Sequence, residues 1–292
     1  MPQSSESPST KPSRRPEWLS RVLCICLFTA VVMAASGYAF YALIAHFDDP
    51  ELNEVVTLEA RDTPGIQVTS RRVQSCVAII ESRLTMLGVP DYEVTAEGED
   101  RIVVALPEGT DIEAVVPTLL QGGYLEFYDA ARMGDAYDSA TEALADAGVT
   151  SEQELASNTS LVFWPAEEWR SGTDQYYLVR TPPALVGETI RAAVYDLQTP
   201  NGSYKINLEL GDEGAGALAQ VTKALAATAV ATGVTQQLVI VLDGVVYSAM
   251  AVLEEIQDGK VEIVGNFTRR EAKDLAAVLQ TGAMALDLGR VE

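Results

Sequence analysis

The stretch that decides the fold of the first lobe is residues 70–89, which read SRRVQSCVAIIESRLTMLGV. Its apolar residues recur at spacings of three and four, which places them on one face of an amphipathic helix. They are Val73, Cys76, Val77, Ile80, Leu84 and Leu87. Gly88 follows them, and glycine commonly ends a helix because it adopts the left-handed conformation without steric cost. The pattern therefore predicts a helix that buries this face and ends at Gly88.

The segments around this helix predict strands and a second helix. We expect a strand and turn at residues 54–65, a hairpin at 92–97 and 101–106, a short helix interrupted by Pro117 at 111–120, and a strand at 123–129. The resulting order, β-α-β-β-α-β, is the split βαβ signature of a ferredoxin-like sandwich. We therefore predict an α+β protein whose first lobe, residues 54–130, is ferredoxin-like.

The remainder of the chain predicts an insertion and a second lobe. Residues 131–175 are acidic and loosely helical, and we interpret them as an insertion over the surface of the neighbouring lobe. Residues 176–287 predict a second α+β lobe with an alanine-rich helix at 212–231. In this lobe Thr268 and Glu271 have the spacing of a capping box, which opens a last helix that Gly282 ends.

Residues 236–250, QQLVIVLDGVVYSAM, predict a β-hairpin in the second lobe. The pair Asp243-Gly244 suits a type I′ turn, which needs positive φ at both central positions. Both arms are apolar at nearly every residue, whereas a hairpin with one solvated face alternates between apolar and polar residues. Either both faces are covered by the rest of the protein, or one face receives a partner.

Both interpretations of the hairpin stay open. In the first, alternate residues pack on the helices (Leu238, Ile240 and Leu242) and under the insertion (Val239, Val241, Val245 and Tyr247). In the second, part of residues 245–253 lines a groove in which an extended polypeptide docks by pocket contacts or strand addition. The candidate polypeptide-contact residues are Val245, Tyr247, Met250 and Val252.

The first 47 residues predict a membrane anchor. Residues 1–21 are rich in Ser and Pro and predict a disordered tail, whereas residues 22–47 contain no formal charge and predict a transmembrane helix. A signal peptide has a shorter apolar region of about 7–15 residues, although the small residues AASGYA leave cleavage open as the alternative. Basic residues precede the span and acidic residues follow it, so we expect a single-pass protein of the cytoplasmic membrane with its C-terminal domain outside.

The charge of the exported part excludes nucleic-acid binding. The tail holds four of the 20 basic and two of the 42 acidic residues, which leaves 16 basic and 40 acidic residues and a net charge of −24 after the span. Such a domain repels nucleic acid and anionic lipid headgroups. The lipid bilayer is therefore expected as a partner only through residues 22–47.

The side-chain inventory predicts neither an enzyme nor a cofactor or metal site. The only histidine, His46, lies at the predicted membrane edge, which excludes Ser-His-Asp and Cys-His mechanisms in the exported part. Cys76 is the single exported thiol and is expected to be buried and inert. Adjacent acidic pairs lack the spacing of calcium loops and are interpreted as solvated surface, and they are Asp48-Asp49, Glu167-Glu168 and Glu254-Glu255.

Several segments together resemble a known family. LGVPDYEVTAEGEDRIVVALP, GYLEFYD, LVGETI, QQLVIVLDGVVYSA and IVGNFTRREAKDLAAVLQTGA occur in this order between residues 87 and 283. This order resembles the first extracytoplasmic (P1) domain of the SecD family, a membrane subunit of the bacterial Sec protein-export machinery. The resemblance implies a base lobe and an inserted head lobe that swings and engages a polypeptide emerging from the Sec channel.

The sequence also departs from that family. SecD proteins continue into five further membrane helices that drive motion with SecF, whereas this sequence reads LDLGRVE at its end, so we expect a version truncated after the P1 domain. Met250 stands where the family tends to have Pro, and DDPELNEVV replaces a Gly-rich segment. We therefore expect a non-catalytic accessory that contacts translocating polypeptides, Sec translocon components or a SecF-like subunit. The alternatives are an extracytoplasmic scaffold without an export role and one half of a split SecD.

Overall fold

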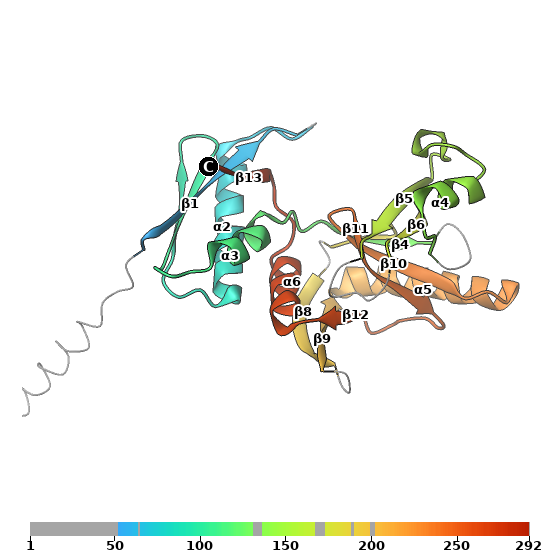
Figure 1. Cartoon of the computed structure of the whole chain (residues 1–292). Coiled ribbons are helices and arrows are strands. Elements are labelled where there is room, and N and C mark those ends of the chain that lie inside the picture. The colour runs from blue at the N-terminus through green and yellow to red at the C-terminus, as the bar shows by residue number, and fades with distance from the viewer. Residues whose placement is uncertain are drawn as a thin grey trace, which may run out of the picture. The chain divides into compact units, whose positions relative to one another are not determined.

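The first lobe is built on a four-stranded antiparallel sheet with the strand order β13-β1-β3-β2. The computed structural model describes residues 52–63, 65–130, 136–166, 173–187, 190–198 and 202–291. The sheet strands are β1 (Glu54–Arg61), β2 (Glu93–Glu97), β3 (Arg101–Leu106) and β13 (Asp287–Val291). Helices α2 (Ser70–Leu87) and α3 (Ile112–Leu120) lie on one face of the sheet (Figure 1). We call these six elements the base.

The base core follows from the sequence pattern. Every second residue of β1 is buried (Val56, Leu58 and Ala60), and these side chains pack against the predicted apolar face of α2. The helix begins after Thr69, whose hydroxyl accepts a hydrogen bond from the amide of Arg72. It ends at Gly88 with φ of 71°, as predicted. Cys76 is fully buried in this core, which also agrees with the prediction.

One strand of the base was assigned wrongly from the sequence. Residues 123–129 were predicted to close the base sheet, but strand β4 (Leu125–Asp129) pairs with β10 (Gln236–Leu242) in the second lobe. The closing strand is β13, which pairs antiparallel with β1 from Thr57↔Val291 to Arg61↔Asp287. The alternating pattern of β4 predicts a half-buried strand but does not indicate which sheet it joins. The ferredoxin-like order is thus completed by a strand that follows the whole second lobe.

The second lobe, which we call the head, contains two sheets. A six-stranded sheet has the order β6-β5-β11-β10-β4-β7, and a three-stranded antiparallel sheet has the order β12-β9-β8. The further strands of the first sheet are β5 (Thr159–Trp164), β6 (Gln175–Arg180), β7 (Leu185–Val186) and β11 (Val245–Val252). The second sheet comprises β8 (Ile190–Gln198), β9 (Ser203–Leu210) and β12 (Lys260–Phe267).

Two helices share one core with both head sheets. Helices α5 (Asp212–Thr232) and α6 (Arg269–Thr281) bury Leu218, Leu225, Leu275 and Leu279 against Leu238, Ile240, Ile206 and Phe267. The capping box at the start of α6 forms as predicted, because Thr268 and Glu271 each accept a hydrogen bond from the other's backbone amide. Gly282 follows the last helical residue, also as predicted.

The segment predicted as an acidic insertion contributes regular structure to the head. It contains the short helix α4 (Ala140–Asp146), a 3-10 turn (Glu152–Glu154) and strand β5. Strand β5 pairs antiparallel with β6 over six residues and touches β11 through the single pair Val245↔Phe163. Trp164 packs against the apolar clusters on both faces of the six-stranded sheet. The insertion therefore extends this sheet in addition to lying over it.

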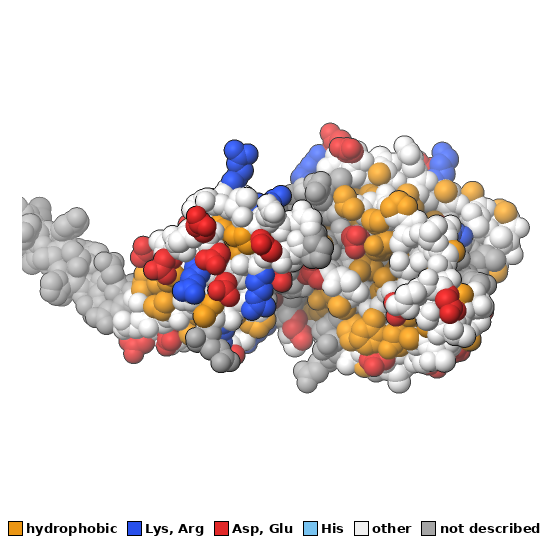
Figure 2. Space-filling model, turned by 90° about the horizontal axis from the view of Figure 1, so that it is seen from above, with side chains coloured by type: hydrophobic (Ala, Val, Ile, Leu, Met, Phe, Trp, Pro, Cys, Tyr) orange, Lys and Arg blue, Asp and Glu red, His pale blue; other side chains and the backbone are white. Residues whose placement is uncertain are grey.

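The surface is as acidic as the composition indicates. Figure 2 shows Asp and Glu side chains over both lobes, and hydrophobic side chains that gather on the head. Among the described residues no helix has the length and apolarity needed to cross a bilayer. The transmembrane helix predicted at residues 22–47, the tail and His46 lie outside the described residues.

Candidate functional site at the junction of base and head

The chain passes between base and head twice, and Arg83 of α2 binds both crossings. Residues 121–124 form the outgoing crossing after α3, and residues 282–286 form the returning crossing after α6. The Arg83 guanidinium is fully buried and donates to the carbonyl oxygens of Thr118 (2.9 Å), Leu119 (3.2 Å) and Gln121 (2.6 Å). It also donates to Thr281 Oγ1 at 3.1 Å and to the Gly282 carbonyl at 3.2 Å. One side chain thus joins the end of α3 to the end of α6.

Main-chain carbonyls accept four of the five hydrogen bonds from this buried charge. Burial lowers the pKa of Arg83 to about 10, so the guanidinium stays charged at neutral pH. The carbonyls that it binds belong to the C-terminal ends of α3 and α6, where the helix dipole is negative. Among the described residues no carboxylate lies within ion-pair distance of it, although the charge of Asp243 raises its pKa.

Asp243 binds the outgoing crossing from the head side. The turn between β10 and β11 forms as predicted, with φ of 51° at Asp243 and 80° at Gly244. The Asp243 carboxylate accepts hydrogen bonds from the amides of Gly123 (3.0 Å) and Tyr124 (2.8 Å). Its own amide donates to the Tyr124 carbonyl at 2.9 Å. The hairpin turn is therefore also a fixed contact to the segment that leaves the base.

Close packing at the junction requires glycine at residues 122 and 123. A Cβ on Gly122 would lie 2.7 Å from Asp243 Oδ1. A Cβ on Gly123 would lie 2.7 Å from the Gly282 carbonyl oxygen and 3.1 Å from Arg83 Nη2. These distances are shorter than ordinary van der Waals contacts, so a side chain here would push the two crossings apart.

The two crossings also bind each other directly. The amide of Met284 donates to the Gly122 carbonyl at 2.6 Å, and the Tyr124 hydroxyl donates to the Met284 carbonyl at 2.6 Å. The junction is therefore a continuous hydrogen-bonded unit built from both crossings, α2 and the hairpin turn.

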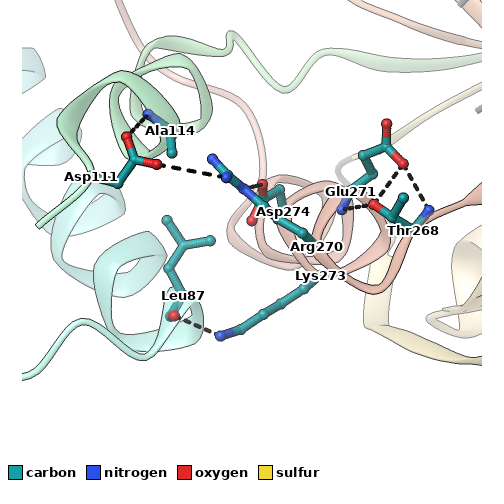
Figure 3. Close-up of polar contacts among 8 residues, drawn as sticks. All are labelled: Leu87, Asp111, Ala114, Thr268, Arg270, Glu271, Lys273 and Asp274. Atoms are coloured by element: carbon teal, nitrogen blue, oxygen red, sulfur yellow. Dashed lines mark hydrogen bonds and ion pairs between the residues drawn. The ribbon is translucent and has the colours of Figure 1, made fainter. Parts of the chain in front are cut away.

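A second set of contacts joins α6 to the ends of the base helices. Lys273 Nζ donates to the Leu87 carbonyl at 2.6 Å, at the C-terminal end of α2 (Figure 3). Arg270 lies 3.9 Å from the carboxylate of Asp111, the N-cap of α3, and 3.7 Å from that of Asp274. A cation at a helix C-terminus is favourable because it faces the negative end of the helix dipole. Unlike the Arg83 contacts, these polar contacts lie near solvent.

Sequence reasoning missed Arg83 and the role of Asp243. Position 83 follows Ile80 by three and precedes Leu87 by four, so it lies on the apolar face of α2. A charged residue on a buried face is a signal of an internal binding role. The adjacent glycines 122 and 123 were a second signal, because they mark a close backbone approach.

The four predicted contact residues of β11 differ in accessibility. Val252 is only 1% exposed and lies in the head core, whereas Val245, Tyr247 and Met250 are half-buried. A bulge between the pairs Ile240↔Ser248 and Val241↔Val246 leaves Tyr247 opposite no residue of β10. Val246, which pairs with Val241 across the turn, lies in the second apolar cluster together with Val239 and Val241, and the last two were expected there. Tyr247 follows Val246 and packs on the helix side of the sheet, so its predicted place under the insertion is wrong. Tyr247 was placed on the wrong face because the alternation was continued through the turn, whereas a two-residue turn pairs Val241 with Val246 and leaves Tyr247 on the opposite face.

No group of three or more His, Cys, Asp or Glu within the described ranges could hold a metal ion. Burial raises the pKa of the Cys76 thiol, which keeps it protonated and unreactive. Glu255 forms an ion pair with Lys223 at 3.5 Å, whereas the pairs Asp48-Asp49 and Glu167-Glu168 lie outside the described residues.

The fold and the junction define a class: a ferredoxin-like domain whose last strand follows an inserted α+β lobe. The family model "SecDF, P1 head subdomain" matches residues 164–286, and the model "Protein translocase subunit SecDF, P1 domain, N-terminal" matches residues 73–132. The chain belongs to the SecD family, and the described part is its P1 domain with base and head.

Individual relatives agree with this assignment. The chain is 29% identical over 235 residues to the protein translocase subunit SecD of Syntrophobacter fumaroxidans, covering 80% of this chain and 41% of the relative. It is 27% identical to SecD of Dictyoglomus turgidum, covering 81% of this chain and 45% of the relative. The chain thus spans less than half the length of these relatives.

Solved structures match the same region. A crystal structure of SecDF in the super-membrane-facing form aligns with a TM-score of 0.57 and 25% identity, covering 82% of this chain and 29% of that one. A second structure, of a membrane component SecDF that enhances protein export, aligns with a TM-score of 0.56 and 25% identity, covering 82% of this chain and 98% of that one. The fold of the described residues is therefore that of the P1 domain.

Proposed function

We propose that this chain is a membrane-anchored, non-catalytic component of protein export, whose P1 domain contacts translocating polypeptides or components of the Sec translocon. The observation that carries the proposal is that the two P1 family models match this chain in order, at residues 73–132 and 164–286.

The proposed contact surface on β11 consists of Val245, Tyr247 and Met250, which are half-buried, whereas the fourth candidate, Val252, lies in the head core. On the side of β11 that faces away from β10, the described residues form one pair with β5, Val245↔Phe163. The later residues of β11 have no pairing partner in the described part of β5. Extended polypeptides bind such strands through main-chain hydrogen bonds and side-chain pockets. Met250 adds a flexible, polarisable side chain that accommodates different sequences.

Site-specific photocrosslinking in cells tests this surface. A photoreactive residue at position 247 or 250 is expected to trap secreted chains or Sec subunits. The matched control is position 230 on α5, where Val230 is 87% exposed but lies on another element. Equal crosslinking from all three positions, or recovery of no export partner from 247 and 250, would refute the proposed surface.

We further propose that residues 22–47 anchor the chain in the cytoplasmic membrane with the P1 domain outside. The support is the uncharged length of this segment and the basic residues before it. Protease added to intact spheroplasts is expected to digest the P1 domain and spare residues 1–21. Protection of the domain would reverse the proposed orientation.

The alternative function is an extracytoplasmic scaffold that keeps the P1 fold without a role in export. Deletion of the gene separates the two functions. A general secretion defect supports the export role, whereas normal secretion with loss of one specific envelope complex supports the scaffold.

A further inference from the structure

A cavity of about 500 Å³ lies where α6 meets the ends of α2 and α3. We call it the seam pocket. Its apolar wall consists of Leu87, Val89, Ala114, Val115 and Tyr195. Its polar lining consists of Arg269, Arg270, Lys273, Asp111 and Asp274. An apolar wall with a few convergent polar groups is the usual composition of a ligand site.

The polar lining has an excess of positive charge in a strongly acidic domain. Three cationic side chains, all from the first half of α6, face two carboxylates. The residues that follow the predicted span carry a net charge of −24, so a cationic pocket is opposite in sign to its surroundings. A local site of this kind attracts anionic groups that the remainder of the surface repels.

The two carboxylates of the pocket do not neutralise all three cations. Arg269 is exposed and has no hydrogen-bond or ion-pair partner among the described residues. Arg270 lies 3.7 Å and 3.9 Å from its two carboxylates, which is longer than a hydrogen bond (Figure 3). Lys273 donates to the Leu87 carbonyl, so its partner is a backbone group without formal charge.

We infer that the seam pocket binds an extended polypeptide segment in which an acidic and an apolar side chain lie two residues apart. An arginine presents a planar fork of donors that matches a carboxylate, and a charge-assisted bond of this kind is stronger than a neutral one. Side chains two residues apart in an extended segment point to the same side, so the apolar wall beside Arg269 and Arg270 accepts the apolar side chain of this pair. This site is separate from the β11 surface and does not depend on it.

The domain charge favours a peptide over an anionic membrane surface. A lipid headgroup is held in a bilayer whose negative charge faces the whole domain, and the two surfaces repel each other. A peptide segment brings a few carboxylates on an extended chain and does not approach the rest of the acidic surface. The seam pocket is therefore expected to bind the few carboxylates of a peptide in preference to the continuous negative charge of a membrane surface.

The test uses the full chain in detergent and a fluorescein-labelled octapeptide of sequence Glu-Ser-Leu-Ser-Glu-Ser-Leu-Ser, in which each Glu and the next Leu lie two residues apart. Fluorescence anisotropy is expected to show saturable binding, which weakens at least tenfold when Gln replaces Glu in the peptide and also when Ser replaces Leu. The variant Arg269→Gln is expected to weaken binding about tenfold, which corresponds to one lost charge-assisted bond of about 1.4 kcal/mol.

The matched control is Lys223→Gln, which removes the same charge from α5, where Lys223 is 71% exposed. It is expected to leave peptide binding unchanged. Circular dichroism of both variants verifies that each remains folded, which is expected because Arg269 has no partner to lose. Equal affinity for the Glu and Gln peptides, or equal effects of Arg269→Gln and Lys223→Gln, would overturn the inference.

Vesicles containing phosphatidylglycerol provide the competing outcome. If the full chain binds these vesicles in an Arg269-dependent manner and does not bind the Glu–Leu peptide, the pocket is a lipid site and the inference is wrong. Crosslinking at positions 247 and 250 reports on the other surface, so failure of that experiment and failure of this one are distinguishable.

Discussion

Arg83 of α2 donates a hydrogen bond from Nε to Thr281 Oγ1 at 3.1 Å, although the two residues are 198 positions apart in the sequence. The same guanidinium binds three carbonyls at the end of α3. The contact therefore joins the point where the chain leaves the base to the point where it returns from the head. The predictions below concern this junction, the seam and the base core.

Replacement of Arg83 by Met is expected to destabilise the domain by about 3–5 kcal/mol, because several buried carbonyls lose a charged donor. The matched control is Arg71→Met on the same helix, where the side chain is exposed and the expected change is within about 0.5 kcal/mol. Urea unfolding followed by circular dichroism measures both. Similar free energies of unfolding for the two variants would show that the Arg83 contacts contribute little.

Asp243→Ala is expected to destabilise the domain by more than the positive φ at this position alone explains. Asp243 and Asp91 are the two described non-glycine residues with positive φ, at 51° and 45°. Both alanine variants lose a residue that tolerates this conformation, but only Asp243 also accepts hydrogen bonds from Gly123 and Tyr124. We expect Asp243→Ala to lower the free energy of unfolding by about 1–3 kcal/mol more than Asp91→Ala. Equal losses would mean that the turn acts only through its backbone conformation.

Gly123→Ala is expected to disturb the junction, whereas Gly98→Ala is not. Both glycines have positive φ, at 83° and 70°, so both variants carry a similar conformational cost of about 1 kcal/mol. A Cβ at residue 98 meets nothing within 4 Å, whereas one at residue 123 would lie 2.7 Å from the Gly282 carbonyl oxygen. Thermal unfolding should show the larger drop in Tm for Gly123→Ala. A comparable drop for both would indicate that the crossings separate easily.

Lys273→Met is expected to loosen the seam between α6 and the base. Lys273 Nζ binds the Leu87 carbonyl at 2.6 Å, so its loss leaves the C-terminal end of α2 without this cap. Hydrogen exchange by mass spectrometry should become several-fold faster in peptides that contain the last turn of α2. Lys260→Met, on an exposed position of β12, removes the same charge and should leave that exchange unchanged.

Cys76 is expected to react with a thiol reagent only when the base opens. Its pKa is raised from 9.0 by burial, so at pH 7 to 8 the thiolate is scarcer than for an exposed cysteine. In a Cys24→Ser, Cys26→Ser background, labelling by a disulfide reagent should be slow in buffer and rapid in urea. Its rate should rise with pH, because deprotonation generates the nucleophile. Immediate labelling in buffer would show that the base core is open around α2.

Local features of the fold were predictable from the sequence because they depend on neighbouring residues. The face of α2, its end at Gly88, the capping box of Thr268 and the turn at Asp243-Gly244 each follow from short-range spacing and backbone preference. Each of these features depends on residues that are close together in the sequence, so it can be predicted without knowing how distant segments pack.

Long-range pairing was not predictable in the same way. Strand β4 was expected in the base sheet, but it joins the head, and β13 takes its place beside β1. The pattern of a half-buried strand is the same in either sheet, so its partner depends on the whole topology. Tyr247 was also assigned to the wrong face, because Val241 pairs with Val246 across the two-residue turn and Tyr247 follows on the opposite face.

The junction was missed because its chemistry is distributed along the chain. Arg83 alone is one arginine on an apolar face, and Asp243 alone is a common turn residue. Their joint role appears only when residues 121–124 and 282–286 lie between them. The seam pocket has the same origin, since α6 supplies its cations and α2 and α3 supply much of its apolar wall.

The position of β13 also sets an order of events during biosynthesis. The edge of β1 that receives β13 stays open until residues 287–291 have left the ribosome, after all of the intervening head has been made. The head has its own core and can fold first, whereas the base must wait with an unpaired strand edge. A nascent chain stalled before residue 287 is therefore expected to leave this strand edge open to aggregation and proteolysis.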